Sequence, residues 1–323
     1  MGGPILVGDV GGTNVRFALA ARRNGVMEIE QFQKLPGGSS DSFEDALRRY
    51  LDESGARPAS ACFALAGPIE NQEVTLTNRQ WNVSAAAVKA QFGLEDVRLI
   101  NDFHAMARAV PEYEVTSFDE IVSGTPKPGA PKLVAGPGTG FGVATLLPGR
   151  SAGEWHVVSG EGGHMAYAPR TAIELELTRL LARDHGYVSN ELVASGSGLE
   201  EVHRAFCEIF DRECLELSPQ EMRQLADDGD EMFRSLIEVR ALTVMGAVGD
   251  LVLANGALGG VVLAGGVTER ISDFLKTPLA RASFVSRGPM SGYLEACPIW
   301  LMHDAAAPLI GAAANFEQTH NLC

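Results

Sequence analysis

Hydrophobic and polar residues along the chain mark out strands, turns and helices in a regular order. An apolar run at 5–7 is followed by Gly8 and Asp9, then by a glycine pair at 11–12, and apolar and polar residues alternate from Val15. Alternation with a period of two is typical of a half-buried strand, and a glycine pair is typical of a turn. The N-terminal stretch is therefore predicted to form a strand, a tight turn and a second strand.

The segments after this hairpin predict strands that alternate with helices. Ser42 stands where its side chain can cap the first of these helices. Strands are expected at 27–34, 60–65, 73–77 and 97–100, and helices at 42–51, 84–92 and 103–110. A three-stranded meander followed by alternating strands and helices predicts a mixed sheet covered by helices.

The second half of the chain repeats the opening design. An apolar strand, a glycine-threonine turn at 138–140 and an alternating strand make up residues 133–146. Helices are expected at 172–183, 199–210, 219–225 and 230–255, strands at 261–264 and 299–302, and a last helix at 305–315 that packs back on the first half. The fold class is therefore α/β with duplicated mixed-sheet cores, in a small domain of residues 1–110 plus 304–323 and a large domain of residues 111–303.

One apolar segment, 241–264, is nearly long enough to span a membrane. Asp250 and Asn255 are its strongly polar residues, and five glycines interrupt it. Its last residues have the pattern of a buried strand that enters a turn. The expectation is a buried helix followed by a buried strand, in a protein without a membrane partner.

The charge of the chain limits its partners. There are 41 acidic and 26 basic residues, a formal charge of -15, and no lysine- or arginine-rich run. This composition argues against nucleic acids and anionic membranes as partners. The phosphate-binding string Gly-x-x-x-x-Gly-Lys-Ser/Thr is absent from the sequence. A nucleotide would therefore be held by backbone amides and a metal ion.

The cysteines indicate a reducing compartment. The chain has five, at 62, 207, 214, 297 and 323, without a Cys-x-x-Cys pair. Their odd number and wide spacing predict reduced thiols, a cytoplasmic location and no structural zinc. Cys207 and Cys214 would share one helix face if the helix at 199–210 extended that far, and core packing is their expected role. Because the first motif begins by residue 8, no signal peptide is expected.

Gly11 and Gly12 are the first candidates for a ligand site. Glycines can adopt positive φ and leave main-chain N–H groups uncovered, so the turn can form a nest for an anion such as phosphate. Asp9 beside it can hold the Mg²⁺ that accompanies a nucleotide, usually through water. The alternative is an ordinary glycine turn with a solvated aspartate. The similar turn at 138–140 is expected to face the first across a cleft.

Asn101 and Asp102 follow a predicted strand, and open α/β sheets present functional groups at such strand ends. The Asp102 carboxylate can accept the proton of an attacking hydroxyl. It can equally cap the helix that follows. The residues alone leave both interpretations open.

Glu161 and His164 stand on a loop with two glycines and can hydrogen-bond the hydroxyls of a small polyol. Zinc is the competing ligand, although one histidine and one glutamate make a weak set, and an isolated histidine is more often structural. Glu191 by itself is expected to be a solvated surface carboxylate. Gly265 and Gly266 can let an adenine ring approach the backbone, and a plain turn between strand and helix fits them equally.

These motifs occur in a specific order: Gly8 to Asn14, Leu76 to Asn78, Ile100 to Phe103, Gly138 to Gly140, Gly160 to His164, Val188-Ser189, Glu191, Ser195-Gly196, Leu199, Ala264 to Gly266 and His303-Asp304. In this order and spacing the chain resembles, nearly end to end, the bacterial ATP-dependent glucokinases of the actin-like, ribonuclease-H-like ATPase superfamily. The resemblance implies a two-domain actin-like fold with an interdomain cleft, ATP and Mg²⁺ as cofactors, glucose as substrate, and a homodimer.

The resemblance also implies roles for individual residues. Asp102 matches the general base. The residues expected to bind the sugar are Asn78, Asn101, Asp102, Glu161, His164 and Glu191. Those expected to bind the nucleotide are Gly8, Asp9, Val10, Gly11, Gly12, Thr13 and Asn14 in the first phosphate loop, Gly138, Thr139 and Gly140 in the second, and Gly265 and Gly266 as the adenosine motif.

The chain departs from the family pattern at a few positions. Pro137 and Phe141 flank the second loop, where smaller or aliphatic residues are common, and Asn190-Glu191-Leu192 replaces a more usual Ala-Glu-Arg. The cysteine-rich zinc motif of the repressor, open-reading-frame and kinase group of sugar kinases is absent, which favours the non-zinc glucokinases. The expected reaction is transfer of the γ-phosphoryl group of ATP to the 6-hydroxyl of glucose. Alternatives are another hexose or amino sugar, polyphosphate as donor, or a non-catalytic sensor built on the same fold.

Overall fold

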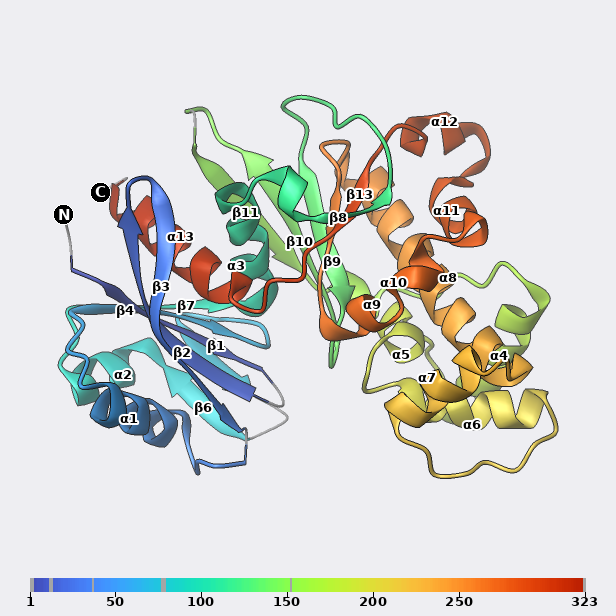
Figure 1. Cartoon of the computed structure of the whole chain (residues 1–323), viewed down its shortest axis with the longest axis horizontal. Helices are drawn as coiled ribbons and strands as arrows, with labels where there is room; N and C mark the ends of the chain where they lie inside the picture. The colour runs from blue at the N-terminus through green and yellow to red at the C-terminus, as the bar shows by residue number, and fades with distance from the viewer. Residues whose placement is uncertain (1–2, 12–13, 37, 77–79, 152, 322–323) are drawn as a thin grey trace. The chain divides into compact units, whose positions relative to one another are not determined.

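The computed structural model describes residues 3–11, 14–36, 38–76, 80–151 and 153–321 (Figure 1). Contacts within the chain divide it into two compact units. The first contains Met1–Ser117, Leu146–Ser159 and Asp304–Cys323, and the second contains Phe118–Thr145 and Gly160–His303. Residues 111–117 and 146–159 thus group with the first unit, whereas the sequence analysis assigned them to the large domain.

The first unit is built on a five-stranded mixed sheet with strand order β3-β2-β1-β4-β7. β1 (Ile5–Val10) forms an antiparallel hairpin with β2 (Asn14–Arg23), which pairs with β3 (Val26–Pro36). On the other side of β1, β4 (Ser60–Leu65) and then β7 (Asp96–Asn101) add parallel strands. The predicted N-terminal hairpin and mixed sheet are confirmed.

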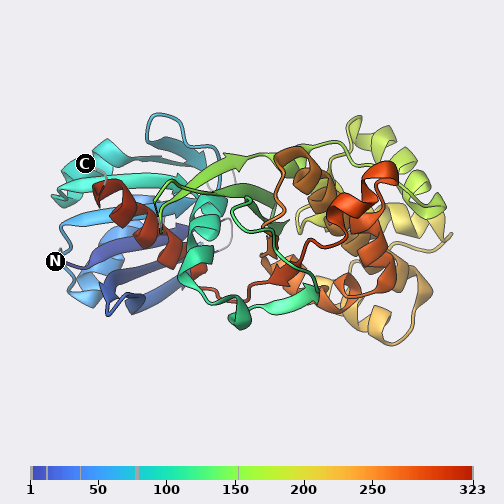
Figure 2. The same cartoon turned by 90° about the horizontal axis from the view of Figure 1, so that it is seen from above.

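Helices cover both faces of this sheet (Figures 1 and 2). Because successive side chains of a strand point to opposite faces, Leu6 and Val10 of β1 pack on one face and Val7 on the other. The first face carries α1 (Phe43–Ser54), α2 (Ala85–Phe92), β5 (Glu73–Leu76) and β6 (Trp81–Ser84), and the second carries α3 (Asp102–Ala109) and α13 (Ala307–Asn321). Two short 3₁₀ turns follow α3, η1 (Val110–Glu112) and η2 (Val115–Ser117).

Local capping explains where α1 begins. The Ser42 hydroxyl accepts a hydrogen bond from the backbone N–H of Asp45 at 3.0 Å, as predicted. Such a cap satisfies one of the backbone donors that a helix leaves unpaired at its start.

The C-terminal helix α13 packs back on the first unit, as predicted, and crosses the strands in Figure 2. A Cβ atom on Gly311 would overlap the carbonyl of Ala105, so the absence of a side chain there lets α13 approach α3 closely. Gln318 bonds both backbone groups of Trp155, at 3.1 and 2.7 Å. This pairing helps to explain why residues 146–159 group with the first unit.

The second sheet has six strands, in the order β11-β10-β9-β12-β13-β8. They are β8 (Asp119–Val122), β9 (Lys132–Pro137), β10 (Phe141–Pro148), β11 (Trp155–Gly160), β12 (Val261–Leu263) and β13 (Ile299–Leu301). β12 runs parallel to β9 and β13, and β8 is antiparallel to β13. The run β10-β9-β12-β13 has the same order as β2-β1-β4-β7, so the predicted duplication is confirmed.

The remaining helices belong to the second unit. They are η3 (Gly162–His164), α4 (Ala172–His185), α5 (Asn190–Ala194), α6 (Leu199–Ile209), α7 (Pro219–Asp227), α8 (Glu231–Asn255), α9 (Gly266–Arg270), α10 (Ser272–Leu275), α11 (Pro278–Val285), η4 (Gly288–Met290) and α12 (Ser291–Leu294).

α8 contains residues 241–255 of the apolar segment. Asp230 caps its start by accepting hydrogen bonds from Met232 N and Phe233 N, and Gly256, with φ of 63°, ends it. β12 then follows as a fully buried strand, which confirms the predicted buried helix and strand. Among the described residues, no helix combines the length and the apolar character that crossing a membrane requires.

α6 is too short to contain both Cys207 and Cys214. It ends at Ile209, and Asp211, with φ of 51°, turns the chain away from the helix axis. Cys214 therefore lies in the loop between α6 and α7. The condition under which Cys207 and Cys214 would share one helix face, a helix that extends to residue 214, is not met.

Candidate functional site

The first glycine turn connects β1 to β2. Gly11 N donates to Asn14 O at 3.1 Å, and among the described residues that oxygen, at 4.0 Å, is the one near neighbour that a Cβ atom on Gly11 would have. With respect to the described residues, the side of the turn at Gly11 is therefore open. Gly12, Thr13 and Asn78, three of the expected ligand-binding residues, lie outside the described residues.

Gly8 and Val10 face the core instead. A Cβ atom on Gly8 would lie 2.7 Å from the ring of Phe63 and 3.0 Å from that of Phe17. The Val10 side chain is fully buried between the sheet and its helices. Packing accounts for both side-chain choices, and only the backbone atoms of these residues remain for a ligand.

Asp9 lies near the end of β1 and pairs with Arg16 across the hairpin. Arg16 Nη1 donates to Asp9 Oδ2 at 2.8 Å and also to the carbonyl of Ala305 at 3.3 Å. The Asp9 side chain is 13 % exposed. Burial raises the pKa of Asp9 above its ordinary value, and the Arg16 charge and hydrogen bond oppose that rise. Asp9 is therefore not the solvated aspartate of the alternative interpretation.

Asp102 is the first residue of α3, directly after β7. Asn101 is the cap of this helix, because its Oδ1 accepts from Phe103 N at 2.9 Å and from His104 N at 3.1 Å. Asp102 Oδ1 accepts from the same Phe103 N at 2.9 Å. Asn101 already accepts from both N–H groups, so the contact of Asp102 with Phe103 N adds no newly satisfied donor.

The second glycine-threonine turn, 138–140, is closed by a hydrogen bond from Gly138 N to Gly140 O at 2.8 Å. Two neighbouring backbone groups hold it, since Gly196 N donates to Gly138 O at 2.9 Å and Ser197 N to Thr139 O at 3.0 Å. A Cβ atom on Gly138 would have no neighbour within 4 Å among the described residues. Neighbouring backbone groups therefore fix this turn in place. Its side at Gly138, like the side of the first turn at Gly11, is open with respect to the described residues.

Just after β12, the chain passes close to this turn at residue 265, and only glycine fits there. Its φ is 102°, and a Cβ atom on it would lie 2.6 Å from Pro137 O. A side chain is excluded by both conformation and space. Gly266 starts α9, so the two glycines do form a turn between a strand and a helix.

Glu191, on α5, is the residue that joins the second turn to the predicted sugar loop. Its Oε2 accepts from Phe141 N at 2.7 Å, and its Oε1 lies 3.7 Å from His164 Nε2. A Cβ atom on Gly140 would lie 2.7 Å from the same Oε2. The Glu191 side chain is 24 % exposed. The expectation of a solvated surface carboxylate is therefore wrong.

The loop that carries Glu161 and His164 packs on β10 through its two glycines. A Cβ atom on Gly163 would overlap the carbonyl of Phe141, and one on Gly162 would lie 3.0 Å from both Val143 and Leu251. The His164 side chain stays 58 % exposed. His164 therefore lies at the surface of its unit and beside a carboxylate, unlike a structural histidine buried in a core.

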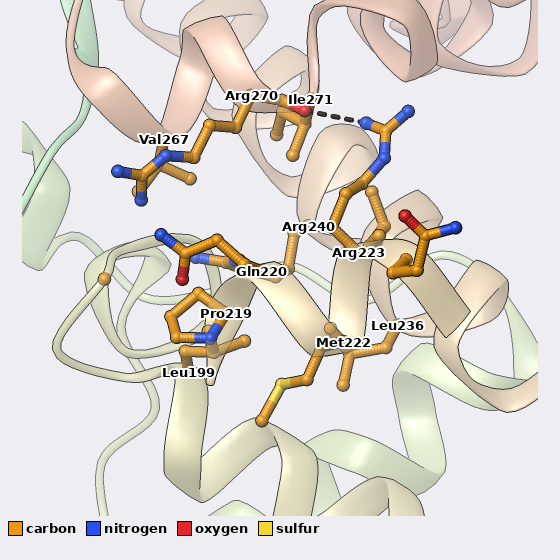
Figure 3. A pocket seen from close by; sticks show the side chains of 13 residues that line it. Leu199, Pro219, Gln220, Met222, Arg223, Leu236, Arg240, Val267, Arg270 and Ile271 are labelled. Carbon is orange, nitrogen blue, oxygen red and sulfur yellow. Dashed lines mark hydrogen bonds between the residues drawn. The ribbon is translucent and has the colours of Figure 1, made fainter. Parts of the chain in front are cut away.

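A cavity of about 300 Å³ adjoins the second turn on the side of Gly196 and Val267 (Figure 3). Apolar side chains from α6, α7, α8 and α9 form much of its wall, and Gln220 and Arg270 supply polar groups. The lining residues labelled in Figure 3 are Leu199, Pro219, Gln220, Met222, Arg223, Leu236, Arg240, Val267, Arg270 and Ile271.

Arg240 is a buried cation in the wall of this cavity. It is 5 % exposed, and its Nη2 donates to the carbonyls of Ala194 at 2.9 Å and Ser195 at 2.8 Å. Within the part of the chain that the structure describes, its Nε has no hydrogen-bond partner. Burial lowers the pKa of Arg240 to about 10, and the charge of Arg270 adds to that effect.

Arg16, Gln220, Arg240 and Arg270 are not among the site residues predicted from the sequence. Arg240 had at most a weak signal, since it directly precedes the apolar segment 241–264 and follows Glu238 by two residues in α8. Arg16 had a weaker one, because its place opposite Asp9 follows from the hairpin register. Gln220 and Arg270 become neighbours of the same cavity only through the packing of α7 and α9.

Two sheets of the same strand order, each with a glycine turn after its leading strand, define a protein of the actin-like ATPase class. The family model described as Glucokinase matches residues 6–319. The chain therefore belongs to the glucokinase family, and it is an ATP-dependent hexose kinase.

Relatives match along almost the whole chain. A glucokinase of Saccharophagus degradans is 38% identical over 319 residues, which cover 98% of each chain. A glucokinase of Chromobacterium violaceum is 39% identical over 314 residues, which cover 97% of this chain and 89% of that one. The crystal structure of a glucokinase from an Antarctic psychrotroph is 35% identical with a TM-score of 0.84, and covers 97% of this chain and 98% of that one. The predicted family and fold class are confirmed.

Proposed function

We propose that this chain transfers the γ-phosphoryl group of ATP to the 6-hydroxyl of glucose, with Asp102 as general base. The observation that supports the proposal is that Asn101 and Asp102 have different roles at the start of α3. Asn101 caps the helix, so a carboxylate at the next position is not needed for helix formation. A positioned carboxylate that accepts the hydroxyl proton contributes roughly 10²–10⁴ in rate.

Sugar hydroxyls are assigned to Glu161, His164 and Glu191, together with Asn101 and Asn78. The support is that Glu191 and His164 approach each other to 3.7 Å on elements held by glycine packing. Carboxylates accept and an imidazole donates or accepts hydrogen bonds, so this set can bind several hydroxyls of one sugar. Asn101 Nδ2 already donates to Gly67 O at 3.2 Å and keeps a second N–H for a ligand.

The phosphates of ATP are assigned to the backbone amides of the two glycine turns. In each turn a glycine position is open to a ligand, Gly11 in the first and Gly138 in the second. The adenosine is assigned to the cavity of Figure 3, which begins beside Gly196 and Val267. Its apolar wall suits a purine face, and the unpartnered Nε of Arg240 can donate to a ring nitrogen.

Mg²⁺ is assigned to Asp9. A carboxylate near the phosphate turn fits the hard oxygen ligands that this ion prefers, and one carboxylate plus phosphates and water is its usual environment in kinases. The partly buried ion pair with Arg16 holds the carboxylate in place. When bound, the ion would neutralise charge on the phosphoryl oxygens. Positioning and charge neutralisation then supply most of the rate acceleration.

A homodimer in the cytoplasm completes the proposal. The family resemblance supports the dimer, and light scattering on the purified chain measures it. The described cysteines, at 62, 207, 214 and 297, are free, which fits a reducing compartment.

Substrate and donor panels test the function. We expect ADP formation with glucose and ATP, and a product phosphorylated at the 6-position by ³¹P NMR. 6-Deoxyglucose should compete with glucose for binding without being phosphorylated. A higher kcat/KM with another hexose, an amino sugar or polyphosphate would overturn the assignment, and sugar binding without any phosphoryl transfer would favour a non-catalytic sensor.

A further inference from the structure

His203, Cys207 and Cys214 form a cluster of side chains that have no assigned role in the proposed reaction. One ligand atom from each can be chosen so that all three lie within 4.8 Å of one another. His203 Nε2 lies 3.4 Å from Cys207 Sγ, and His203 Nδ1 lies 3.9 Å from Cys214 Sγ. His203 and Cys207 are one turn apart on α6 and so lie on the same face of that helix.

The imidazole of His203 is poorly satisfied by the protein. It is 3 % exposed and packs against the ring of Phe233, with ring centroids 5.5 Å apart. Among the described residues, the hydrogen-bonding contacts of its ring nitrogens are the two thiols. Thiols are weak donors and weak acceptors, whereas buried polar groups normally have strong partners. This arrangement points to a ligand that binds nitrogen and sulfur together.

We propose that His203, Cys207 and Cys214 bind a zinc ion. Zn–S distances of about 2.3 Å and Zn–N distances of about 2.0–2.1 Å place tetrahedral ligand atoms roughly 3.5–3.8 Å apart. One ion binds only one His203 nitrogen, and the three ligand atoms lie within 4.8 Å of one another, so their longest separation must shorten by up to about 1 Å to reach that spacing. Two thiolates and an imidazole are a typical soft donor set for this ion.

The fourth coordination position faces a cavity. A space of about 610 Å³ is lined by both His203 and Cys214, so water can complete the tetrahedron.

The loop that carries Cys214 is also anchored next to α6, which supports the site. Arg212 N donates to Cys207 O at 2.9 Å, and Arg212 Nη1 pairs with Asp230 at 2.8 Å. Cys214 is therefore already held close to α6.

The role of this zinc is structural. It ties the loop before α7 to α6, and these elements also bound the cavity assigned to adenosine. Both cavities share Gly196, Leu199, Pro219 and Met222. Loss of the ion should therefore loosen the connection between α6 and α7.

A disulfide between Cys207 and Cys214 is the competing use of the same residues. It would occupy both sulfurs and leave the buried His203 ring without a metal or a thiol partner. The zinc site accounts for all three side chains, whereas the disulfide accounts for two. The sequence analysis expected core packing and no structural zinc, because spacing along the chain does not show that Cys214 folds back to His203.

The test uses the full chain, purified without a polyhistidine tag and under reducing conditions. We expect one equivalent of zinc per chain by elemental analysis, and thiolate-to-metal charge transfer when Co²⁺ replaces it. Cys214→Ser should weaken zinc binding at least about tenfold, as even loss of an outer-shell partner does at metal sites. Because Cys214 is exposed, this change leaves the core intact. The matched control is Cys62→Ala, which removes a cysteine of the first unit outside the cluster.

Three results would overturn the proposal. The first is a chain that takes up no zinc or Co²⁺ at all. The second is zinc affinity unchanged in Cys214→Ser, or lowered equally in Cys62→Ala. The third is an intact-mass and peptide analysis that finds Cys207 joined to Cys214 in the chain isolated from cells. Chelation of the zinc should also lower the unfolding temperature of the wild type and leave that of Cys214→Ser unchanged.

Discussion

A methyl group added at Gly140 tests how Glu191 is held. The new Cβ would lie 2.7 Å from Glu191 Oε2, the oxygen that accepts from Phe141 N. The carboxylate is the mobile end of a side chain, so we expect it to move rather than the backbone. Gly140→Ala therefore removes one charge-assisted hydrogen bond and moves Glu191 relative to His164.

The size of the effect follows from that bond. A hydrogen bond to a charged group contributes about 1.5–3 kcal/mol to folding. For a domain of this size, the same loss lowers the unfolding temperature by roughly 3–12 °C. If Glu191 also binds the sugar, the KM for glucose should rise roughly 2- to 10-fold. This rise corresponds to the free energy of one neutral hydrogen bond, about 0.5–1.5 kcal/mol.

Gly138→Ala is the matched control, because it adds the same methyl group in the same turn with no neighbour within 4 Å among the described residues. Both substitutions restrict the unfolded chain equally, so their difference isolates the contact with Glu191. Denaturant unfolding of both variants, monitored by circular dichroism, gives the two free energies. Equal unfolding free energies for Gly140→Ala and Gly138→Ala would refute the reasoning.

Two further predictions concern the first unit. Gly11→Val should change the unfolding free energy by less than about 0.5 kcal/mol, since the nearest described neighbour of a Cβ atom there is Asn14 O at 4.0 Å. The KM for ATP should rise while glucose binding persists. Parallel loss of both ligands in calorimetry would contradict this. Burial lowers the pKa of His104, so stability should fall as pH drops below about 6.5, by at most about 1.4 kcal/mol per pH unit. His104→Gln should flatten that slope in urea titrations, and an unchanged slope would be evidence against it.

The elements that could be predicted are those whose signal is local. The hairpin of β1 and β2, the Ser42 cap and the buried helix α8 all follow from period, glycine and capping residues next to one another in the chain. Three strands were missed, β6, β8 and β11. β6 and β8 have only four residues each, and β11 is largely exposed with weak alternation. Pairing with a neighbouring strand, rather than sequence pattern, makes them strands.

The candidate site shows the same limit. Asp102 could be placed at the end of a strand, but only the structure shows that Asn101 is the cap. Glu191 looks solvated in the sequence because its partner, Phe141, is 50 residues away along the chain. The sequence motifs therefore identified candidate residues, but tertiary packing determines which of them contact one another.

The most direct test of the account is the Asp102→Asn variant. An asparagine can still accept from Phe103 N, so the start of α3 should be preserved. Isothermal titration with glucose and rapid-quench measurement of glucose 6-phosphate formation separate binding from chemistry. We expect glucose affinity close to that of the wild type and a phosphoryl-transfer rate lower by roughly 10²–10⁴. A transfer rate near that of the wild type in Asp102→Asn would contradict the assignment of Asp102 as the general base.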